Sequence, residues 1–257
     1  MARTPILTGY FTMVRKDFVR IIRIWSQTLL PPAVTTGLYF AIFGTFIGSQ
    51  VAAVKGFSYI QFIVPGIIMM SVITSAYMNT VSTFYFAKWQ RTIDELLVSP
   101  MPSWTVIAGF VTGGLMRAGL TAIVVVLVAL FFTHLTFFSM GILLGAVFLT
   151  ALLMSLLGLI NAIFAKSFDA ISIVPTFVLT PLTYLGGVFY SVDQLPEFFR
   201  TISMANPILY MVNAFRYGFL GVSDVPMSIA FAVMGGLTAV AFGVTLFLFR
   251  NGAGLKN

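Results

Sequence analysis

Residues 60–86, IQFIVPGIIMMSVITSAYMNTVSTFYF, form an apolar stretch that contains no charged side chain. The stretch exceeds the roughly 20 residues that an α-helix needs to cross about 30 Å of hydrocarbon. A helix also satisfies its own backbone hydrogen bonds, which the interior of a bilayer cannot do for it. The sequence here therefore predicts a membrane-spanning helix.

Five further stretches of this kind fill most of the 257-residue chain. They are residues 29–47, 103–132, 140–164, 171–190 and 228–249. Charged residues make up 8% of the sequence, against roughly 25% in soluble domains. We therefore expect an all-α integral membrane protein with six transmembrane helices. The stretch 29–47 is too long for the apolar region of a signal peptide, so we expect it to be retained.

The basic residues are distributed unevenly over the segments between these stretches. Of the 14 lysines and arginines, ten lie before the first stretch, after the second or fourth, or after the last, whereas the segments on the other side hold three. Because cytoplasmic segments are rich in lysine and arginine, both termini are predicted to be cytoplasmic. This placement argues against nucleic acid as the partner that explains the net charge of +7. The absence of cysteine and the single histidine exclude disulfides and a multi-histidine metal cluster.

Residues 1–28 contain a basic amphipathic pattern. Phe11, Phe18 and Trp25 fall on one helical face, and Lys16 and Arg20 fall on the opposite face. Such a helix lies in the membrane plane with its apolar side towards lipid. We expect an interfacial helix on the cytoplasmic side, either as a simple topology anchor or with a further role.

Several prolines and glycines mark special positions in the predicted spans. Pro65, Pro175 and Pro181 should bend or locally unwind their helices, because proline removes a helical hydrogen bond. Gly109 and Gly113 form one of three small-xxx-small pairs, which let helices approach closely. With 22 glycines in the chain, this pair is a weak signal for any particular interface.

Residues 87–100, AKWQRTIDELLVSP, join the second and third stretches. An apolar face of this segment holds Trp89, Ile93, Leu96 and Leu97. Arg91 and Glu95 are spaced to pair along one helix. We expect a short amphipathic helix, ended by Pro100, that docks a cytoplasmic partner; a plain charged turn is the alternative.

Residues 191–227 contain two apolar runs, 195–204 and 207–221, that are too short to span a membrane. They predict a re-entrant helical hairpin on the outer face, and a packed surface loop is the alternative. The span that follows, 228–249, leads to a short cytoplasmic tail at 250–257.

The chain lacks the groups that several transport mechanisms need. No acidic residue lies within a predicted span, which disfavours a proton-driven carrier. No G-x-x-x-x-G-K-[ST] loop is present, so the chain has no ATP site of that kind, and we assign no catalytic residue. Arg117 is the one ionisable residue inside a predicted span. It either lines an internal cavity or extends to the interface.

Three sequence segments, read together with the order of the elements, resemble the ABC type-2 permease family. They are QFIVPG at 61–66, ELLVSP at 95–100 and NPILYMVNAFR at 206–216. The resemblance covers essentially the whole chain as a single transmembrane domain, 1–257. It implies the G-type exporter fold, with six spans, a coupling helix after the second span and outer re-entrant helices before the sixth. It is strongest for small bacterial inner-membrane permeases.

The resemblance implies a homodimer that carries two ATPase subunits. ATP and Mg²⁺ would bind those subunits, so this chain would hold no cofactor and would not itself be an enzyme. Arg91 and Glu95 would pair with charges of the ATPase, while Trp89, Ile93, Leu96 and Leu97 dock. The second and fifth spans would line the pathway.

The resemblance also places the transport residues. Candidates for the pathway on the second and fifth spans are Phe62, Met69, Met70, Tyr77, Phe84, Tyr85, Phe177 and Tyr184; Arg117 is a further candidate because of its position inside the third span. Arg216 and Tyr210 would belong to an outer gate, and Arg216 would pair with Asp193, Glu197 or Asp224, or contact an anionic substrate. The expected cargo is a hydrophobic or amphipathic drug, lipid or lipid-linked glycan. A membrane scaffold or signalling partner of an ATPase, and less so an ion-driven carrier, remain alternatives.

Overall fold

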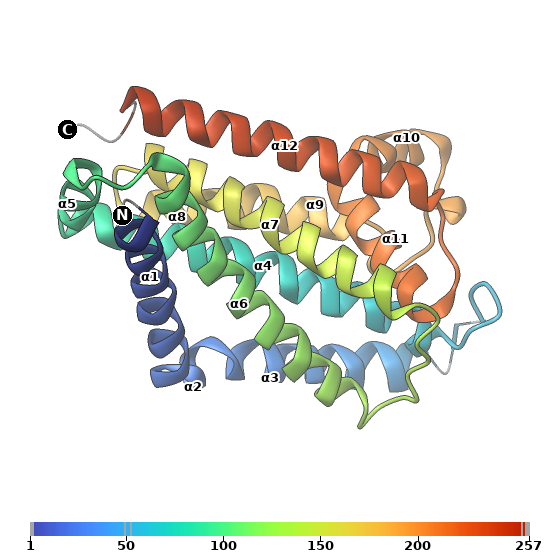
Figure 1. Cartoon of the computed structure of the whole chain (residues 1–257). Coiled ribbons are helices and arrows are strands. Elements are labelled where there is room, and N and C mark those ends of the chain that lie inside the picture. Colours follow the sequence, from blue (N-terminus) through green and yellow to red (C-terminus); the bar gives the residue numbers. More distant parts are fainter. Residues whose placement is uncertain (1–2, 49, 52, 253, 255–257) are drawn as a thin grey trace.

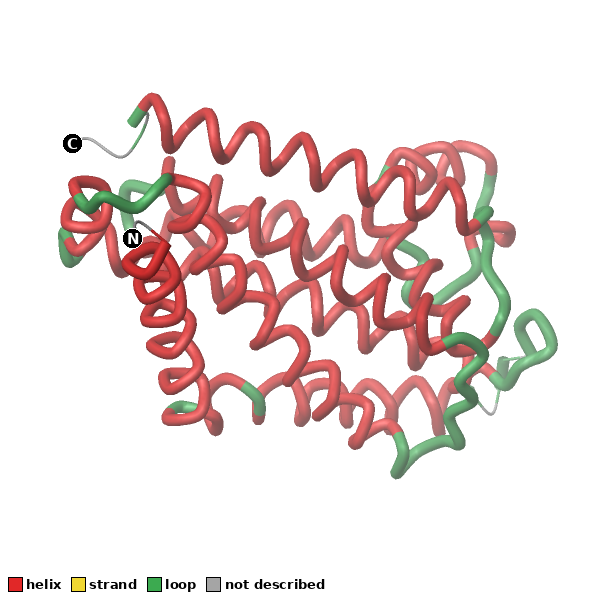
Figure 2. The backbone as a smooth tube through the Cα atoms, viewed as in Figure 1, coloured by secondary structure: helices red, strands yellow, loops and turns green. Residues whose placement is uncertain are grey.

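The computed structural model describes residues 3–48, 50–51, 53–252 and 254. Across these ranges the chain forms helices joined by loops, and its β contact is an isolated bridge between Val54 and Phe57 (Figure 1, Figure 2). The long helices lie side by side in one bundle (Figure 1). The predicted all-α fold is confirmed.

Five helical runs are long and apolar enough to cross a membrane. They are α4 (Tyr59–Trp89), α6 (Ser103–Ala129), α7 (Met140–Phe164), the run Phe168–Leu185 and α12 (Met227–Asn251). Each corresponds to a predicted stretch, with ends that differ by five residues or fewer. These five spans place the chain in a membrane, as its composition indicates.

The predicted stretch 29–47 is also helical, but it is built in two parts. It forms α3 (Leu30–Tyr39), which continues into the π-helix η1 (Phe40–Ile47). Pro31 and Pro32 stand in the first turn of α3, where a missing N–H leaves no helical bond unmade. Because this segment is not among the five long apolar runs, the count of six spans stays a prediction.

The fifth predicted stretch is irregular at its first proline. It consists of α8 (Phe168–Val174), the π-helix η2 (Pro175–Leu179) and α9 (Thr180–Leu185). The Thr180 hydroxyl donates a hydrogen bond to the Pro175 carbonyl at 2.9 Å, across the wider turn. Local unwinding is thus confirmed at Pro175, whereas Pro65 lies inside an unbroken α4.

Helix α4 is the most enclosed span of the described bundle and packs mainly against α7 and α6. The approach to α7 depends on Gly158, since a Cβ there would lie 2.7 Å from the Tyr77 carbonyl oxygen. The apolar side chains Ile68, Val72 and Ala76 are fully buried in this contact region. Most of α4 is therefore fixed by the protomer itself, which leaves a narrow exposed strip.

The N-terminal helices lie across one end of the bundle. Figure 1 shows α1 (Arg3–Arg23) crossing the long helices, followed by the short α2 (Trp25–Thr28). Helix α1 rests on the Gly109 and Gly113 face of α6, where a Cβ on Gly109 would come within 2.8 Å of Met13. The small-xxx-small pair, a weak signal in the sequence, therefore positions the interfacial helix.

The segment before α12 is helical, as predicted. It contains η3 (Val192–Gln194), α10 (Glu197–Ala205) and α11 (Pro207–Leu220). Helix α11 packs against α4, α7 and α12, and α10 lies outside it. These helices stand at the end of the bundle opposite α5 and the end of α12 (Figure 1). The two-helix arrangement agrees with the predicted hairpin, and its depth in a membrane stays a prediction.

Candidate functional site

The predicted docking segment forms its own short helix. After α4 ends at Trp89, the chain turns at Gln90 and Arg91, and α5 (Thr92–Val98) begins. Arg91 adopts a left-handed conformation with φ of 59°, which few residues other than glycine take up readily. The Thr92 hydroxyl donates to the Ala87 carbonyl at 3.1 Å and ties the new helix to the end of α4.

The side chains that this segment buries and exposes differ from those predicted. Ile93 is 1% exposed and packs into the core, and Leu96 is partly buried against it. Trp89 belongs to α4, so the turn separates it from the helix that it was predicted to share. Arg91 precedes α5, and no ion pair joins it to Glu95 within the described ranges.

The apolar surface available to a partner is therefore formed by different residues. Val98 is 86% exposed and its neighbour Leu97 is exposed on α5, whereas Trp89, 62% exposed, lies at the end of α4 with its ring against Phe86 and Phe168. We call Leu97 and Val98 the docking surface, after the role that the sequence predicts for this segment. Val98 was missed because the sequence places it next to the Ser99–Pro100 stop, where the helical period ends. The turn at Arg91, which a helical wheel cannot show, determines which side of α5 faces outward.

A large groove lies beside the docking surface. Its volume is about 710 Å³, and residues of α1, α4, α5 and α6 line it, among them Lys16, Arg20 and Glu95. Asp17 lines it as well, and burial raises the pKa of its carboxyl even though Arg20 and Lys16 lie nearby. The groove contains side chains of both charge signs and lies between α1 and α5.

On the least covered side of α4, Thr74 is exposed, and Met70 and Met78, one helical turn to either side, are partly buried. These residues form a ridge between two cavities. One cavity, of about 360 Å³, lies against α3; the other, of about 290 Å³, lies against η2 and the ends of its neighbours α8 and α9. We call these the α3 cavity and the η2 cavity. Hollows on both sides of one helix mark α4 as the centre of the candidate transport site.

The predicted pathway residues divide into two groups. Phe62, Met69, Tyr77, Phe84 and Tyr85 are buried inside the protomer, and neither cavity described above is lined by them. Their contact with a substrate stays a prediction.

The remaining pathway candidates lie at accessible positions. Met70 lines both cavities, whereas Phe177 on η2 is 74% exposed and Tyr184 on α9 is exposed. The residues that the sequence missed are Thr74 and Met78. Their spacing of four residues along α4, counted from Met70, places all three on the same helical face. The other predicted pathway residues of α4 are instead mainly aromatic and lie on its buried face.

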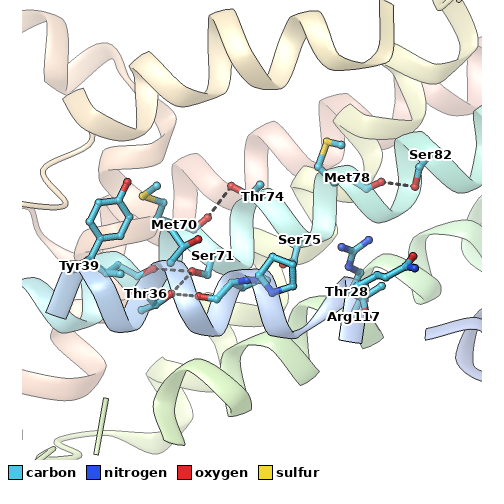
Figure 3. A pocket seen from close by; sticks show the side chains of 15 residues that line it. Thr28, Thr36, Tyr39, Met70, Ser71, Thr74, Ser75, Met78, Ser82 and Arg117 are labelled. Atoms are coloured by element: carbon cyan, nitrogen blue, oxygen red, sulfur yellow. Dashed lines mark hydrogen bonds between the residues drawn. The ribbon is translucent and has the colours of Figure 1, made fainter. Parts of the chain in front are cut away.

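Arg117 of α6 lines the α3 cavity. Figure 3 shows its guanidinium group at one end of the cavity beside Thr28, with Tyr39 at the other end. Its Nε atom is buried and has no hydrogen-bond partner among the described residues. Arg117 thus lines a cavity of the protomer, and whether that position belongs to the pathway or to the membrane interface stays a prediction.

Arg216 of α11 is buried within a network at the opposite end of the bundle. Its Nη2 atom donates to the Gly187 carbonyl at 2.6 Å, and its guanidinium lies 4.0 Å from the ring centroid of Phe62. Its Nη1 atom lies 3.8 Å from Asp224, which is the partner present among the three that the sequence allowed. The second gate candidate, Tyr210, donates to the Met204 carbonyl at 2.7 Å and links α11 to α10.

The carboxylate of Asp224 accepts hydrogen bonds from several groups. Lys55 forms an ion pair with it, the Ser191 hydroxyl donates at 2.6 Å, and the Val192 N–H donates at 3.2 Å. Burial alone would raise the pKa of this carboxyl, but the hydrogen bonds and the charges of Lys55 and Arg216 hold it below its usual range. The group is therefore ionised at neutral pH, and it joins three distant segments at this end of the bundle.

Comparison with known proteins agrees with this geometry. Residues 8–220 match the family described as ABC-2 type transporter. The chain is 52% identical over 242 residues to the inner membrane transport permease YadH of Escherichia coli K12, covering 94% of each protein. It is 28% identical over 217 residues to nodulation protein J of Rhizobium leguminosarum bv. viciae, covering 83% of each. With nodulation protein J of Rhizobium meliloti the identity is 25% over 244 residues, covering 95% of this chain and 93% of that protein.

Proposed function

This chain belongs to the ABC-2 type transporter family, as the sequence resemblance predicted, and we propose that it is the permease subunit of an ATP-driven exporter. Two copies would form the pathway in a bacterial inner membrane, and two separate ATPase subunits would bind ATP and Mg²⁺. The cargo would be hydrophobic or amphipathic. Both termini would be cytoplasmic, and α3 with η1 would be the first of six spans.

The observation that carries this proposal is the position of the α4 ridge between the two cavities. Thr74 is exposed on a helix that is otherwise mostly buried, and Phe177 is exposed on the neighbouring run. In a two-fold homodimer the same surface of each protomer faces its copy. Opposed ridges and η2 segments would then enclose a central space that is lined by methionine, threonine and aromatic side chains. Such a lining suits an amphipathic molecule.

The connection between α4 and α5 supports the coupling role. Ile93 anchors α5 in the core, and the Lys88 ammonium donates to the Ile163 carbonyl at 2.7 Å at the end of α7. Because these contacts hold the connection between α4 and α5 in place, a force on the docking surface would be transmitted to α4. Because α4 carries the ridge, movement of the ATPases would change the width of the pathway.

The outer helices suggest how the pathway closes. Helix α11 is held between α4, α7 and α12, and the Arg216 network joins it to the segment before η3. We assign α10 and α11 to an outer re-entrant gate, with the network as its fixed part. Lipid molecules would surround the exposed apolar faces of α3 and α12.

A membrane scaffold or signalling partner of an ATPase is the second candidate, because a docking surface serves that role equally well. The two cavities favour transport, since a scaffold needs no hollow beside its central helix. An ion-driven carrier finds less support. No carboxylate lines the α3 or the η2 cavity.

The dimer can be tested with single cysteines, because the natural chain contains none. We expect Phe177→Cys to form a cross-linked dimer in membranes under oxidation, since η2 would face its copy. Phe148→Cys, also exposed but on α7, is the matched control and should remain monomeric on denaturing gels. Native mass measurement of the complex should give two copies of each subunit. Equal cross-linking of both variants, or a complex with one permease copy, would contradict the arrangement.

A further inference from the structure

Arg117 is a cation without a countercharge. It forms no hydrogen bond or ion pair with any described residue, and the charge that acts on it is a second cation, Arg20. Arg20 differs, since it donates to Asn79 at 3.0 Å and lies 3.8 Å from Asp17. An unpaired cation inside a membrane span is costly and usually marks a functional site. The contacts of Arg20 with Asn79 and Asp17 account for its position in the structure, whereas Arg117 has no such partner among the described residues.

Four hydroxyl groups of the α3 cavity wall are already engaged as donors, while the side chains of Gln27, Thr35 and Ser75 also line it. Hydroxyls of Thr28, Thr36, Ser71 and Thr74 donate to carbonyls of their own helices. These groups have no proton left to donate to a ligand, and they present methyl groups and oxygen lone pairs instead. A sugar needs many hydrogen-bond donors and acceptors, and these four hydroxyls can offer it acceptors only.

The shape of the cavity separates a charged end from an apolar body. Arg117 and Thr28 lie at one end, and Tyr39 and Met70 lie at the other (Figure 3). Along α4 the lining extends from Ser82 to Ile67, which is about 22 Å at the rise of an α-helix. A cavity of about 360 Å³ with this form fits a slender chain with one charged head.

We propose that the α3 cavity is a loading site for an amphiphile with an anionic head group, which binds the guanidinium of Arg117 while its alkyl chain lies between α3 and α4. The site rests on the proposed transport function, because it names the class of cargo. A phosphate suits the guanidinium, which presents several N–H groups in one plane. From this site the ligand would pass the α4 ridge to reach the η2 cavity and the central pathway.

Photolabelling tests this site without requiring transport. The complete complex in phosphatidylcholine nanodiscs is incubated, without ATP, with a dodecyl phosphate that carries a diazirine in its chain. After irradiation, labelled peptides of α3 and α4 are quantified by mass spectrometry. We expect Arg117→Gln to reduce this labelling at least tenfold, because a charge-assisted contact is lost. Arg117→Lys should retain most of it, and Arg23→Gln, which removes an exposed charge of α1, should leave it unchanged.

Competition on the unaltered protein gives a second readout that does not depend on the folding of a variant. Dodecyl phosphate should displace the probe, whereas dodecyltrimethylammonium, dodecyl maltoside and inorganic phosphate at equal concentration should not. Equal labelling of Arg117→Gln, or displacement by the cationic detergent, would overturn the proposal. Displacement by inorganic phosphate would make this a free-anion site and would also overturn it. Labelling at α3 and α4 in a complex that shows no ATP-driven movement would leave the site intact and reject the exporter.

Discussion

Replacing Arg216 by methionine is expected to prevent most of the protein from folding. Methionine fills similar space but cannot donate to the carbonyls of Gly187 and Val188, which Arg216 contacts at 2.6 and 3.4 Å. Breaking a buried ion pair by removing one partner typically costs about 3–5 kcal/mol. The pair with Asp224 keeps part of its charge balance through Lys55, so we expect the lower part of this range. The yield of monodisperse protein and its thermal midpoint in detergent measure the effect.

Arg200→Met is the control for this prediction. Arg200 also pairs with a carboxylate, Asp193, at 3.7 Å, but both side chains are about half exposed. Exposed pairs contribute roughly 0–1 kcal/mol, so this variant should behave like the unaltered protein. If the Arg216 variant is as stable as the Arg200 variant but has lost transport, Arg216 acts on the substrate and the structural role is rejected.

The second prediction concerns the docking surface. Replacing both Leu97 and Val98 by glutamate should abolish co-purification of the ATPase, with at least a tenfold loss of bound subunit. Two carboxylates would be buried in an apolar contact without partners, which is a large penalty. Because both side chains are exposed in the protomer, the permease itself should insert and elute as before.

Two further variants make this test specific. Val51→Glu adds a carboxylate at an exposed position at the other end of the bundle and should leave the ATPase bound. Ile93→Asp is not a suitable probe, because Ile93 is buried and the change would disturb the core. Normal co-purification with the double glutamate variant would show that α5 does not dock the ATPase.

The helices could be predicted from the sequence because their signal is local. Apolar length identified five spans and the helical stretch 29–47, and the prolines indicated the irregular turn at Pro175. The short helix α5 was predicted in the right place, but Ile93 and Leu96, which were predicted to dock a partner, are buried or partly buried in the protomer. The orientation of α5 depends on the left-handed backbone of Arg91, and nothing in the composition of that segment requires this conformation.

The candidate sites were harder to predict because they depend on distant residues. Asp224 meets Lys55 across 169 positions of the chain, so the sequence could only offer Arg216 several partners. Five aromatic or methionine residues of α4 were candidates for the pathway, yet the neighbouring helices bury them; Phe62, for example, lies against Arg216 of α11. The four-residue spacing of Met70, Thr74 and Met78 places them on one helical face, but which face of α4 is uncovered depends on its packing against α6 and α7.

The central claim is that ATP moves the α4 ridges of two protomers relative to each other. A spin label on Thr74→Cys, in the otherwise cysteine-free chain, reports the distance between the two ridges in the complete complex. We predict a single short distance between protomers without nucleotide, and a shift of several ångströms when ATP and vanadate trap the ATPases. The absence of any distance between protomers, or the same distance in both states, would contradict the account.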